Sequence, residues 1–310
     1  MLTRPETWDL NQLRGSELGR AIVVTTESVA VRATESLPFE FAASLDHLPK
    51  KFDTLVVIGG GTLMDEAKVW RMDQAPGIRL IAIPSLWGSG AEVSPVAVLN
   101  RQGKKVIRVE DELIPDIRCL WPELADTVPE ATARYACGDV WSHALEGLLS
   151  PLADGRLQRD LAELLRDMVA LPLRKDPDWF EFSARACVGQ AQASVGLIHG
   201  IAHCLEGSLC AAFPEANWGH AKLCSIFLWP VMEFNRQHSA KWERLIQEHD
   251  LDGVSILKVL KNLHESDAYD QALPLLEQHW TTILRDPCSR TNGVLVRQTS
   301  KDFFIGRAFE

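Results

Sequence analysis

The sequence predicts two domains of different class, an α/β domain over residues 1–127 and an all-helical domain over residues 128–310. Short apolar, β-branched segments alternate with helical patterns in the first part, which is typical of parallel strands and their covering helices. After Trp121 no strand pattern follows, and long helical periodicity takes its place. A chain of 310 residues is also long for one hydrophobic core, which favours two domains.

Six strands are expected in the first domain. Three of them are near-continuous apolar runs, which indicate parallel strands buried on both faces, and these cover residues 21–25 (AIVVT), 54–58 (TLVVI) and 80–83 (LIAI). The other three strands are expected at residues 93–99, 105–109 and 117–121. A helix is expected over residues 62–71, between the second and third apolar runs.

The second domain is expected to consist of helices, beginning with a long helix over residues 129–149. The remaining helical segments are residues 156–171, 179–205, 220–235, 241–249 and 255–264. Each shows apolar residues at the spacing of three and four that places them on one face of a helix. The boundary between the two domains is therefore expected near residues 125–129.

The composition is that of an ordinary globular protein, with 46% hydrophobic and 24% charged residues. The formal net charge of -10 argues against nucleic acid and against an anionic membrane surface as partners. Seven cysteines are scattered without a CxxC pair, which is typical of reduced thiols. No apolar run approaches the ~18 residues of a membrane span, and the first residues lack a signal peptide's apolar core. The sequence therefore predicts a cytoplasmic protein.

A glycine-rich turn follows the second apolar strand. Residues 58–65 read IGGGTLMD, so Gly59, Gly60 and Gly61 come directly before Thr62 at the start of an expected helix. Glycines let a backbone approach a diphosphate closely, and the free N–H groups of a helix N-terminus favour phosphate. The alternative is a tight strand-to-helix turn in which Thr62 only caps the helix.

A second loop rich in glycine and serine follows the next strand. Residues 84–92 read PSLWGSGAE and include Ser85, Gly88 and Ser89. An α/β sheet builds its ligand crevice from such loops at the carboxyl ends of neighbouring strands. The two loops together favour a dinucleotide-binding, Rossmann-like domain, and an ordinary flexible loop is the alternative.

Two pairs of metal-binding residue types have the spacing of one helical turn. Asp139 and His143 form one pair, His199 and His203 form the other, and each pair projects from one face of a helix. His220 is a fifth candidate. Buried carboxylate–imidazole pairs and core histidines bonded to carbonyls are the alternative. Five such groups in one expected domain favour a metal site, of Zn²⁺ or Fe²⁺ type, although spacing does not say which four would bind.

These motifs together resemble the iron-containing (group III) alcohol dehydrogenase family, in the superfamily that also holds glycerol dehydrogenases and dehydroquinate synthases. The family patterns GGGSxxD, IPTTxGTGSEVTP, DxxxHAxE and GLVHxxAHxLG occur here in order, the last with Glu206 inserted before its glycine. The matching segments are residues 59–65, 83–95, 139–146 and 196–207, followed by family-like VMEFN at 231–235 and DPCSRTN at 286–292.

By this resemblance, four residues would bind the metal: Asp139, His143, His199 and His220. The metal would be Fe²⁺, with Zn²⁺ as the alternative, and it would polarise the substrate oxygen. His203 would lie in the catalytic pocket and relay the proton. The activity implied is that of an alcohol dehydrogenase, which interconverts a small alcohol and its aldehyde or ketone and acts as a reductase in the cell. A homodimer is also expected.

The resemblance implies a nicotinamide cofactor between the two domains. The residues that would bind it are Gly59, Gly60, Gly61, Thr62, Asp65, Ser85, Gly88 and Ser89. The family's aspartate that favours NAD by meeting the adenosine ribose is replaced here by Thr26. Losing this carboxylate relaxes the exclusion of a 2′-phosphate, so NADH and NADPH are both expected.

The chain departs from the family in length. Between Thr26 and Asp53 there is too little sequence for the usual second strand–helix unit, and the helices after Asn235 are trimmed. A non-catalytic relative acting as a binding protein is therefore one alternative. A dehydroquinate synthase-like cyclase that uses NAD and a metal is another, although the Asp139 and His143 spacing argues against it. The ligand types argue against a metal-independent reductase of the maleylacetate type.

Overall fold

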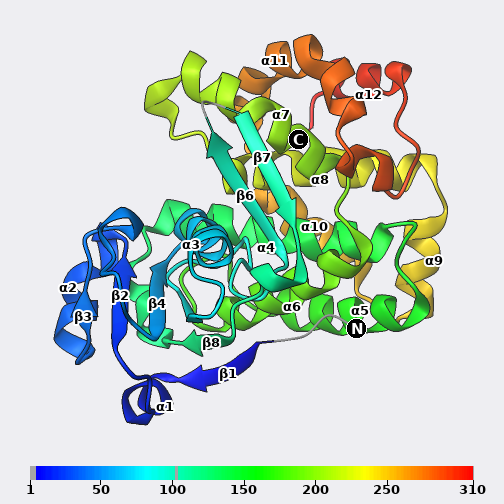
Figure 1. Ribbon diagram of the computed structural model, residues 1–310. Coiled ribbons are helices and arrows are strands. Elements are labelled where there is room, and N and C mark those ends of the chain that lie inside the picture. The colour runs from blue at the N-terminus through cyan, green and yellow to red at the C-terminus, as the bar shows by residue number, and fades with distance from the viewer. Residues whose placement is uncertain (1–4, 102–103, 310) are drawn as a thin grey trace. The chain divides into compact units, whose positions relative to one another are not determined.

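The computed structural model describes residues 5–101 and 104–309, which form two compact units (Figure 1). The first unit contains the described residues up to Pro129 together with Lys175–Val188, and the second contains Glu130–Arg174 and the residues from Gly189 onward. The first unit is α/β and the second helical, which confirms the predicted fold classes. The division differs from a single boundary at residue 127, because Lys175–Val188 packs with the first unit.

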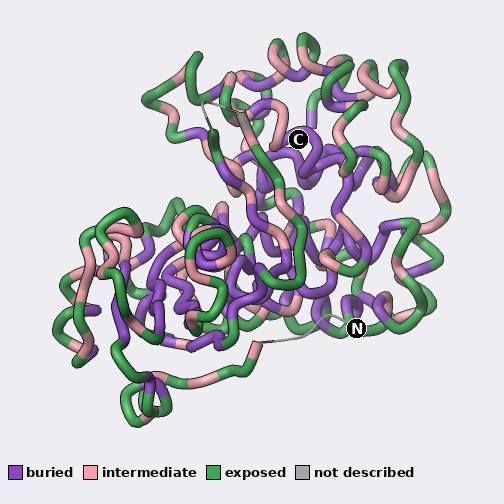
Figure 2. Tube along the Cα trace, viewed as in Figure 1, coloured by how far each residue is buried: buried purple, intermediate pink, exposed green. Residues whose placement is uncertain are grey.

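Within the described residues, the first unit contains a six-stranded parallel sheet. Its strands are β1 (Glu6–Asp9), β2 (Ala21–Thr25), β3 (Glu40–Phe41), β4 (Thr54–Gly59), β5 (Arg79–Pro84) and β8 (Ile117–Leu120). They lie in the order β1-β8-β5-β4-β2-β3, and each neighbouring pair is parallel. β2, β4 and β5 are almost entirely buried (Figure 2), because apolar side chains cover both of their faces. The three strands predicted from apolar runs are confirmed.

The two edge strands are not predicted from the sequence. β1 and β3 are four and two residues long and mostly exposed, so neither carries an apolar run. Helix α1 (Leu10–Gly15) follows β1. The segment between Thr26 and Asp53, in which the sequence predicts no room for a strand–helix unit, contains α2 (Glu27–Ser36) and β3. That unit is therefore shortened but not lost.

A separate antiparallel pair covers one side of helix α3 (Gly61–Gln74). It consists of β6 (Val96–Arg101) and β7 (Lys104–Val109). β6 begins three residues after the predicted start at residue 93, because the preceding residues form a turn. Buried side chains hold the pair to the helix, and these are Val69, Ala97, Leu99 and Leu113.

The chain reverses its direction across the sheet between β2 and β4. β3 lies on the outer side of β2, whereas β4, β5 and β8 extend on the other side. Such a switch point leaves a crevice at the carboxyl ends of the two strands, where α/β sheets bind ligands. Thr26 follows β2 there, and its N–H donates to the carbonyl of Ile58 in β4 at 3.1 Å. The glycine turn predicted from the sequence therefore lies at the switch point.

Helices make up the second unit, and α4 (Glu130–Leu149) runs through its core, with fifteen of its twenty residues buried. A helix that is apolar on most of its circumference must be covered by others. The others are α5 (Gly155–Val169), α7 (Leu197–Ala212), α8 (His220–His238), α9 (Lys241–Glu248), α10 (Gly253–Leu263), α11 (Ser266–Arg285) and α12 (Lys301–Ile305). The sequence does not predict α11, which contains Pro274.

The helical segment predicted over residues 179–205 is two helices, α6 (Asp178–Ala193) and α7. The break lies at Ser194, whose φ is 64°, and at Gly196. A Cβ at position 196 would lie 2.7 Å from Oε1 of Glu146, so glycine is required for this approach. Among the described residues, no single helix is long and apolar enough to cross a membrane, and only α6 and α7 taken together, bent by 103°, meet that length and composition.

Helices α4 and α8 pack at very close range at Gly138, where a Cβ would lie 2.5 Å from Cβ of Ser225. We expect Gly138→Ala to lower the free energy of unfolding by ~1–3 kcal/mol, because the packed core would have to shift. Gly207→Ala in α7 is the matched control, since no described atom lies within 4 Å of its Cβ, and should stabilise by ~0.5–1 kcal/mol. Urea denaturation followed by circular dichroism measures both, and equal effects would contradict the close packing.

Candidate functional site

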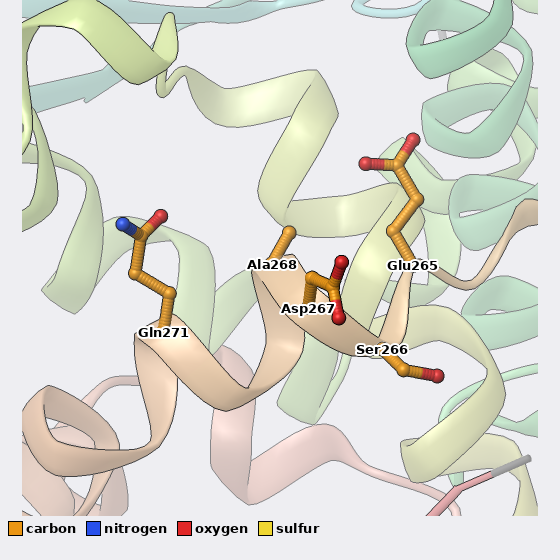
Figure 3. Close-up of a pocket in the computed structure, with 5 residues that line it drawn as sticks. All are labelled: Glu265, Ser266, Asp267, Ala268 and Gln271. Atoms are coloured by element: carbon orange, nitrogen blue, oxygen red, sulfur yellow. The ribbon is translucent and has the colours of Figure 1, made fainter.

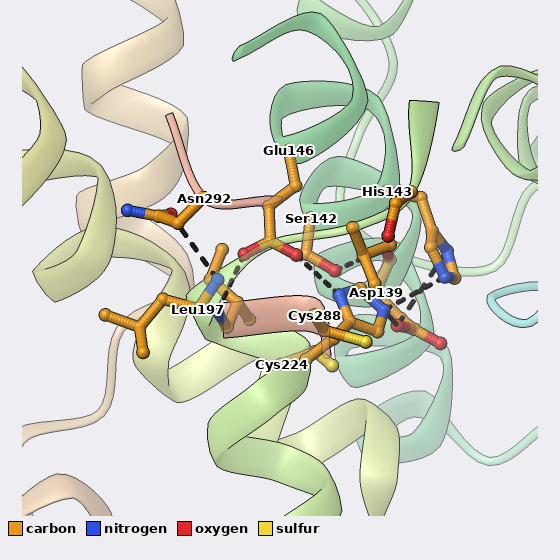
Figure 4. Close-up of polar contacts among 12 residues, drawn as sticks. Asp139, Ser142, His143, Glu146, Leu197, Cys224, Cys288 and Asn292 are labelled. Carbon is orange, nitrogen blue, oxygen red and sulfur yellow. Dashed lines mark hydrogen bonds and ion pairs between the residues drawn. The ribbon is translucent and has the colours of Figure 1, made fainter. Parts of the chain in front are cut away.

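Three helices of the second unit bring the four predicted metal-binding side chains together (Figure 4). Asp139 and His143, both labelled in Figure 4, come from α4. His199 comes from α7, and His220 is the first residue of α8. Oδ1 of Asp139 is 3.9 Å from Nδ1 of His143 and 3.7 Å from Nε2 of His199. The same oxygen is 3.9 Å from Nε2 of His220. One carboxylate oxygen thus lies at the centre of three imidazoles.

Among the described residues, the donor atoms of Asp139, His199 and His220 all lie within 4.8 Å of one another and could hold a divalent metal ion, and His143 is not in the group that this distance defines. Nitrogen and oxygen ligands at 2.0–2.1 Å from a tetrahedral ion lie roughly 3.3 Å apart. The distances of 3.7 and 3.9 Å from Asp139 exceed this value by about half an ångström, which side-chain rotation closes. Imidazole nitrogen with one carboxylate oxygen is a donor set for Zn²⁺ or Fe²⁺. The residues therefore fit the kind of metal that the sequence predicts.

A cysteine that the sequence analysis treats only as a buried thiol lies in the same group. The donor atoms of Asp139, His199, His220 and Cys224 are all within 4.8 Å of one another. Sγ of Cys224 is 3.6 Å from Nε2 of His220, one helical turn away on α8. Burial, with the charges of Asp139 and Glu146, raises the pKa of this thiol well above its usual value. The spacing of four from His220 is the local signal that would have found it.

Glu146 of α4 forms hydrogen bonds with the first turn of α7. Its Oε2 accepts a hydrogen bond from Nδ1 of His199 at 2.7 Å, and its Oε1 accepts one from the N–H of Ile198 at 2.7 Å. Burial raises the pKa of Glu146 to about 8, although backbone N–H groups of Gly196, Ile198 and His199 oppose the rise. The carboxyl group therefore caps the N-terminus of α7 and orients the first imidazole on that helix.

The hydrogen bonds assign the tautomers of two imidazoles. When Glu146 is ionised, Nδ1 of His199 donates to it, and Nε2 of His199 then carries a lone pair in the neutral ring. Nε2 of His143 is 3.0 Å from that atom and must be the donor of the hydrogen bond between the two rings. Nε2 of His199 therefore points toward Asp139 and His143 as an acceptor, which is the form that binds a metal.

His203 lies next to this group but is bonded elsewhere. Its ring stacks on that of His220 with centroids 5.6 Å apart, and its Nδ1 is 3.4 Å from Oδ2 of Asp286. Sγ of Cys288 is 3.9 Å from the same nitrogen. Burial would raise the pKa of Asp286, but the hydrogen bond and charge of His203 lower it overall. The sequence analysis includes Asp286 and Cys288 in a family-like segment but assigns them no role.

In the first unit, the two predicted loops meet at the start of α3. Gly60 is the N-cap of that helix, with no side-chain cap, and open space surrounds the position a Cβ would take. A Cβ on Gly61 would lie 2.6 Å from Oγ of Ser89, so these loops touch. The cap is Gly60 and not Thr62, because the helix begins one residue before the threonine. The turn exposes the N-terminus of α3 as phosphate binding requires.

Two of the predicted cofactor residues, Ser85 and Gly88, are buried beside this turn. The N–H of Ser85 donates to the carbonyl of Gly59 at 3.0 Å, which ties the two loops together. Gly88 has a φ of 117°, and its N–H donates to Oγ of Ser183 in α6 at 2.9 Å. A φ of this sign is strained for residues with a Cβ, which explains glycine at that position.

Asp65 lies one turn into α3 with both carboxylate oxygens bonded to the protein. Oδ1 accepts from Nζ of the fully buried Lys68 at 3.0 Å, and Oδ2 accepts from the N–H of Val98 in β6 at 2.9 Å. Burial raises the pKa of Asp65, and the charge of Lys68 opposes the rise. The bonds join α3 to β6, so Asp65 supports the fold of this region.

Two surface pockets of the described residues are lined by other side chains. One is lined by five residues at the start of α11, Glu265, Ser266, Asp267, Ala268 and Gln271 (Figure 3). The other is in the first unit and includes Arg71 and Arg79, at the amino ends of β4 and β5. Neither is lined by a predicted metal or cofactor residue.

In comparisons with known proteins, the chain is similar to alcohol dehydrogenases. The family model for iron-containing alcohol dehydrogenases matches residues 41–122. The 1-propanol dehydrogenase PduQ of Salmonella typhimurium is 32% identical over 197 residues, which are 58% of this chain and 51% of that protein. The chain spans about half the length of the curated relatives it matches.

Solved structures share the fold over the whole chain. An iron-containing alcohol dehydrogenase from Thermococcus thioreducens matches with a TM-score of 0.75 and 20% identity, and the match covers 99% of both chains. A 1,3-propanediol oxidoreductase matches with a TM-score of 0.76 and 16% identity over 100% of both chains. At these identities the likeness concerns the fold.

The position of Glu146 beneath His199 gives a prediction about metal affinity. We expect Glu146→Gln to weaken Zn²⁺ binding by roughly 10- to 100-fold. The substitution replaces the carboxylate that holds His199 in its Nδ1–H tautomer by a neutral amide. Glu206→Gln is the control, since its Oε2 is 4.0 Å from Nδ1 of His220 and its side chain is partly exposed. Competition with a chelating dye measures both affinities. An equal loss in the two variants would contradict the role of Glu146.

Proposed function

Because this chain belongs to the iron-containing alcohol dehydrogenase family, we propose that it is a metal-dependent, NAD(P)-linked oxidoreductase. It interconverts a small alcohol and its aldehyde or ketone, with reduction as the direction in the cell. The convergence of Asp139 with three imidazoles carries this proposal. The named relatives are alcohol dehydrogenases, which favours this reaction over a dehydroquinate synthase-like cyclase. A homodimer and a cytoplasmic location stay predictions from the sequence.

Four residues of the second unit would hold the metal: Asp139, His143, His199 and His220. A divalent ion there would supply Lewis-acid polarisation of a substrate carbonyl. Glu146 keeps the proton of His199 on Nδ1, so Nε2 stays available as a donor. The same carboxyl group holds the first turn of α7 through the N–H of Ile198, which fixes the position of that imidazole.

His203 is the proposed proton-transfer residue. Its Nδ1 is directed to Oδ2 of Asp286, so Nε2 is the atom that exchanges a proton with the substrate oxygen or with solvent. An imidazole can accept a proton at one ring nitrogen while the other donates a hydrogen bond, which suits this task. Asp286 would hold the ring in one orientation and balance its charge while both nitrogens carry protons. The N–H of Cys288 donates to Oδ1 of Asp286 at 2.8 Å and fixes that carboxylate in turn.

The first unit would bind the nicotinamide cofactor at the turn that follows β4. Gly60 and Gly61 would receive its phosphates, because open space borders Gly60 at the N-terminus of α3. The nicotinamide supplies the hydride when bound. The remaining contacts would come from the neighbouring backbone and hydroxyl groups, Gly59, Thr62, Ser85, Gly88 and Ser89. We assign Asp65 a supporting role, because Lys68 and Val98 already occupy its oxygens.

Removal of one proposed ligand tests the metal centre. We expect His199→Ala to weaken metal binding by more than about 100-fold and to abolish NAD(P)H-dependent aldehyde reduction, because the donor set loses its Glu146-oriented imidazole. His279→Ala is the control, since that ring is bonded to Ser208 and lies outside the donor group. Elemental analysis and an aldehyde reduction assay report the result. Full metal content and unchanged turnover in His199→Ala would remove this assignment.

Thr26 gives a test of cofactor choice. The residue follows β2 at the switch point, where the family carries an aspartate that meets the ribose. We expect Thr26→Asp to raise the Kd of NADPH at least about tenfold, or ~1.4 kcal/mol, while NADH binding is kept, because a carboxylate repels a 2′-phosphate. Thr26→Asn controls for size without charge. Titration by nicotinamide fluorescence measures each Kd, and an equal change for both cofactors would argue against this location of the ribose.

A further inference from the structure

We propose that Cys224 is a ligand of the metal in this protein and that its thiolate makes the centre select Zn²⁺ over Fe²⁺. The inference rests on the metal centre of the proposed function, to which it adds a donor outside the family's pattern of aspartate and histidines. Cys224 is fully buried, and its Sγ lies with donor atoms of Asp139, His199 and His220 in one group.

The helix geometry places the thiol in the right position. Cys224 follows His220 by four residues on α8, so both side chains project from the same face. A sulfur at 2.3 Å and an imidazole nitrogen at about 2.05 Å from a tetrahedral ion lie ~3.6 Å apart. The distance between Sγ of Cys224 and Nε2 of His220 is 3.6 Å. The pair therefore needs no rearrangement to share one ion.

The charge of the donor set supports the same assignment. One carboxylate and one thiolate balance a divalent cation when the remaining ligands are neutral imidazoles. Asp139, His143 and His199 are nearly fully buried, where an unbalanced charge is expensive to desolvate. Coordination replaces the S–H bond of Cys224 by an S–metal bond and releases the proton to solvent.

The sulfur also decides which metal is preferred. Thiolate is a soft ligand that suits Zn²⁺, whereas carboxylate and imidazole alone do not separate Zn²⁺ from Fe²⁺. The second group of potential ligands, His203, Asp286 and Cys288, contains a thiol as well, and it lies beside the first. Cys288 therefore provides a matched control for any effect attributed to Cys224.

Cobalt(II) distinguishes the two thiols, because a Co–S bond gives an intense charge-transfer absorption in the near ultraviolet. Metal-free full-length protein is titrated with one equivalent of Co²⁺. We expect this absorption in the wild type and in Cys288→Ser, and its loss in Cys224→Ser with the visible cobalt bands retained. The proposal would be overturned if Cys224→Ser kept the charge-transfer absorption, or if Cys288→Ser lost it instead.

The same titration separates failure of this inference from failure of the proposed function. Wild-type protein that binds cobalt without thiolate absorption contradicts the role of Cys224 and leaves the metal centre standing. Wild-type protein that binds no cobalt removes both.

Competition between Zn²⁺ and Fe²⁺ under anaerobic conditions gives a second readout. The preference for Zn²⁺ over Fe²⁺ should fall at least about tenfold in Cys224→Ser, because the metal loses its thiolate ligand. Cys224→Ala keeps the apolar character of the position and should lose the preference for zinc to the same extent. The alanine variant is used in place of the serine variant if the serine variant does not fold. An unchanged preference in the alanine variant would also overturn the proposal.

Discussion

The carboxyl group of Glu146 at the N-terminus of α7 is the contact on which the second unit's chemistry depends. The first turn of a helix leaves several N–H groups without partners, and here one buried carboxyl group receives the N–H of Ile198 together with the imidazole of His199. Gly196 permits this approach, because a side chain there would collide with the same oxygen. The helix break at Gly196, the cap of α7 and the orientation of His199 therefore all depend on the carboxyl group of Glu146.

Two asparagines, Asn292 and Asn235, complete this arrangement. Asn292 directs its Oδ1 to the N–H of Leu197 at 3.4 Å, beside Glu146 at the same helix end. Its Nδ2 donates to Oδ1 of Asn235 at the end of α8, and the amide of Asn235 donates back. Two motifs far apart in the sequence thus meet as a reciprocal amide pair. This pair links α8, which carries His220 and Cys224, to the N-terminus of the helix that carries His199.

The sequence could predict those parts of the site whose signal is local. The spacing of four between Asp139 and His143 places both on one face of a helix, and the glycines after β4 mark a turn wherever the rest of the chain lies. The positions of Glu146 and Asp286 depend on packing between helices, for which one sequence carries no signal, whereas the spacing of four from His220 was a local signal for Cys224. The edge strands β1 and β3 were not predictable either, because short exposed strands lack an apolar run. The break between α6 and α7 at Ser194 was not predicted, because apolar residues continue across it. The bonds of Asp65 to Lys68 and Val98 could not be predicted from the motif, and its contact with a cofactor stays a prediction.

The cap of α7 also has a consequence for the order of folding. Its bonds join residues that are 52 and 95 positions apart in the sequence, so neither can form until distant parts of the chain have met. Contacts of this separation form late, because loop closure must precede them. A nascent chain would hold Asp139 and His143 on one helix well before His199 is oriented to join them. High-affinity metal uptake would therefore follow the assembly of the helices and would mark its completion.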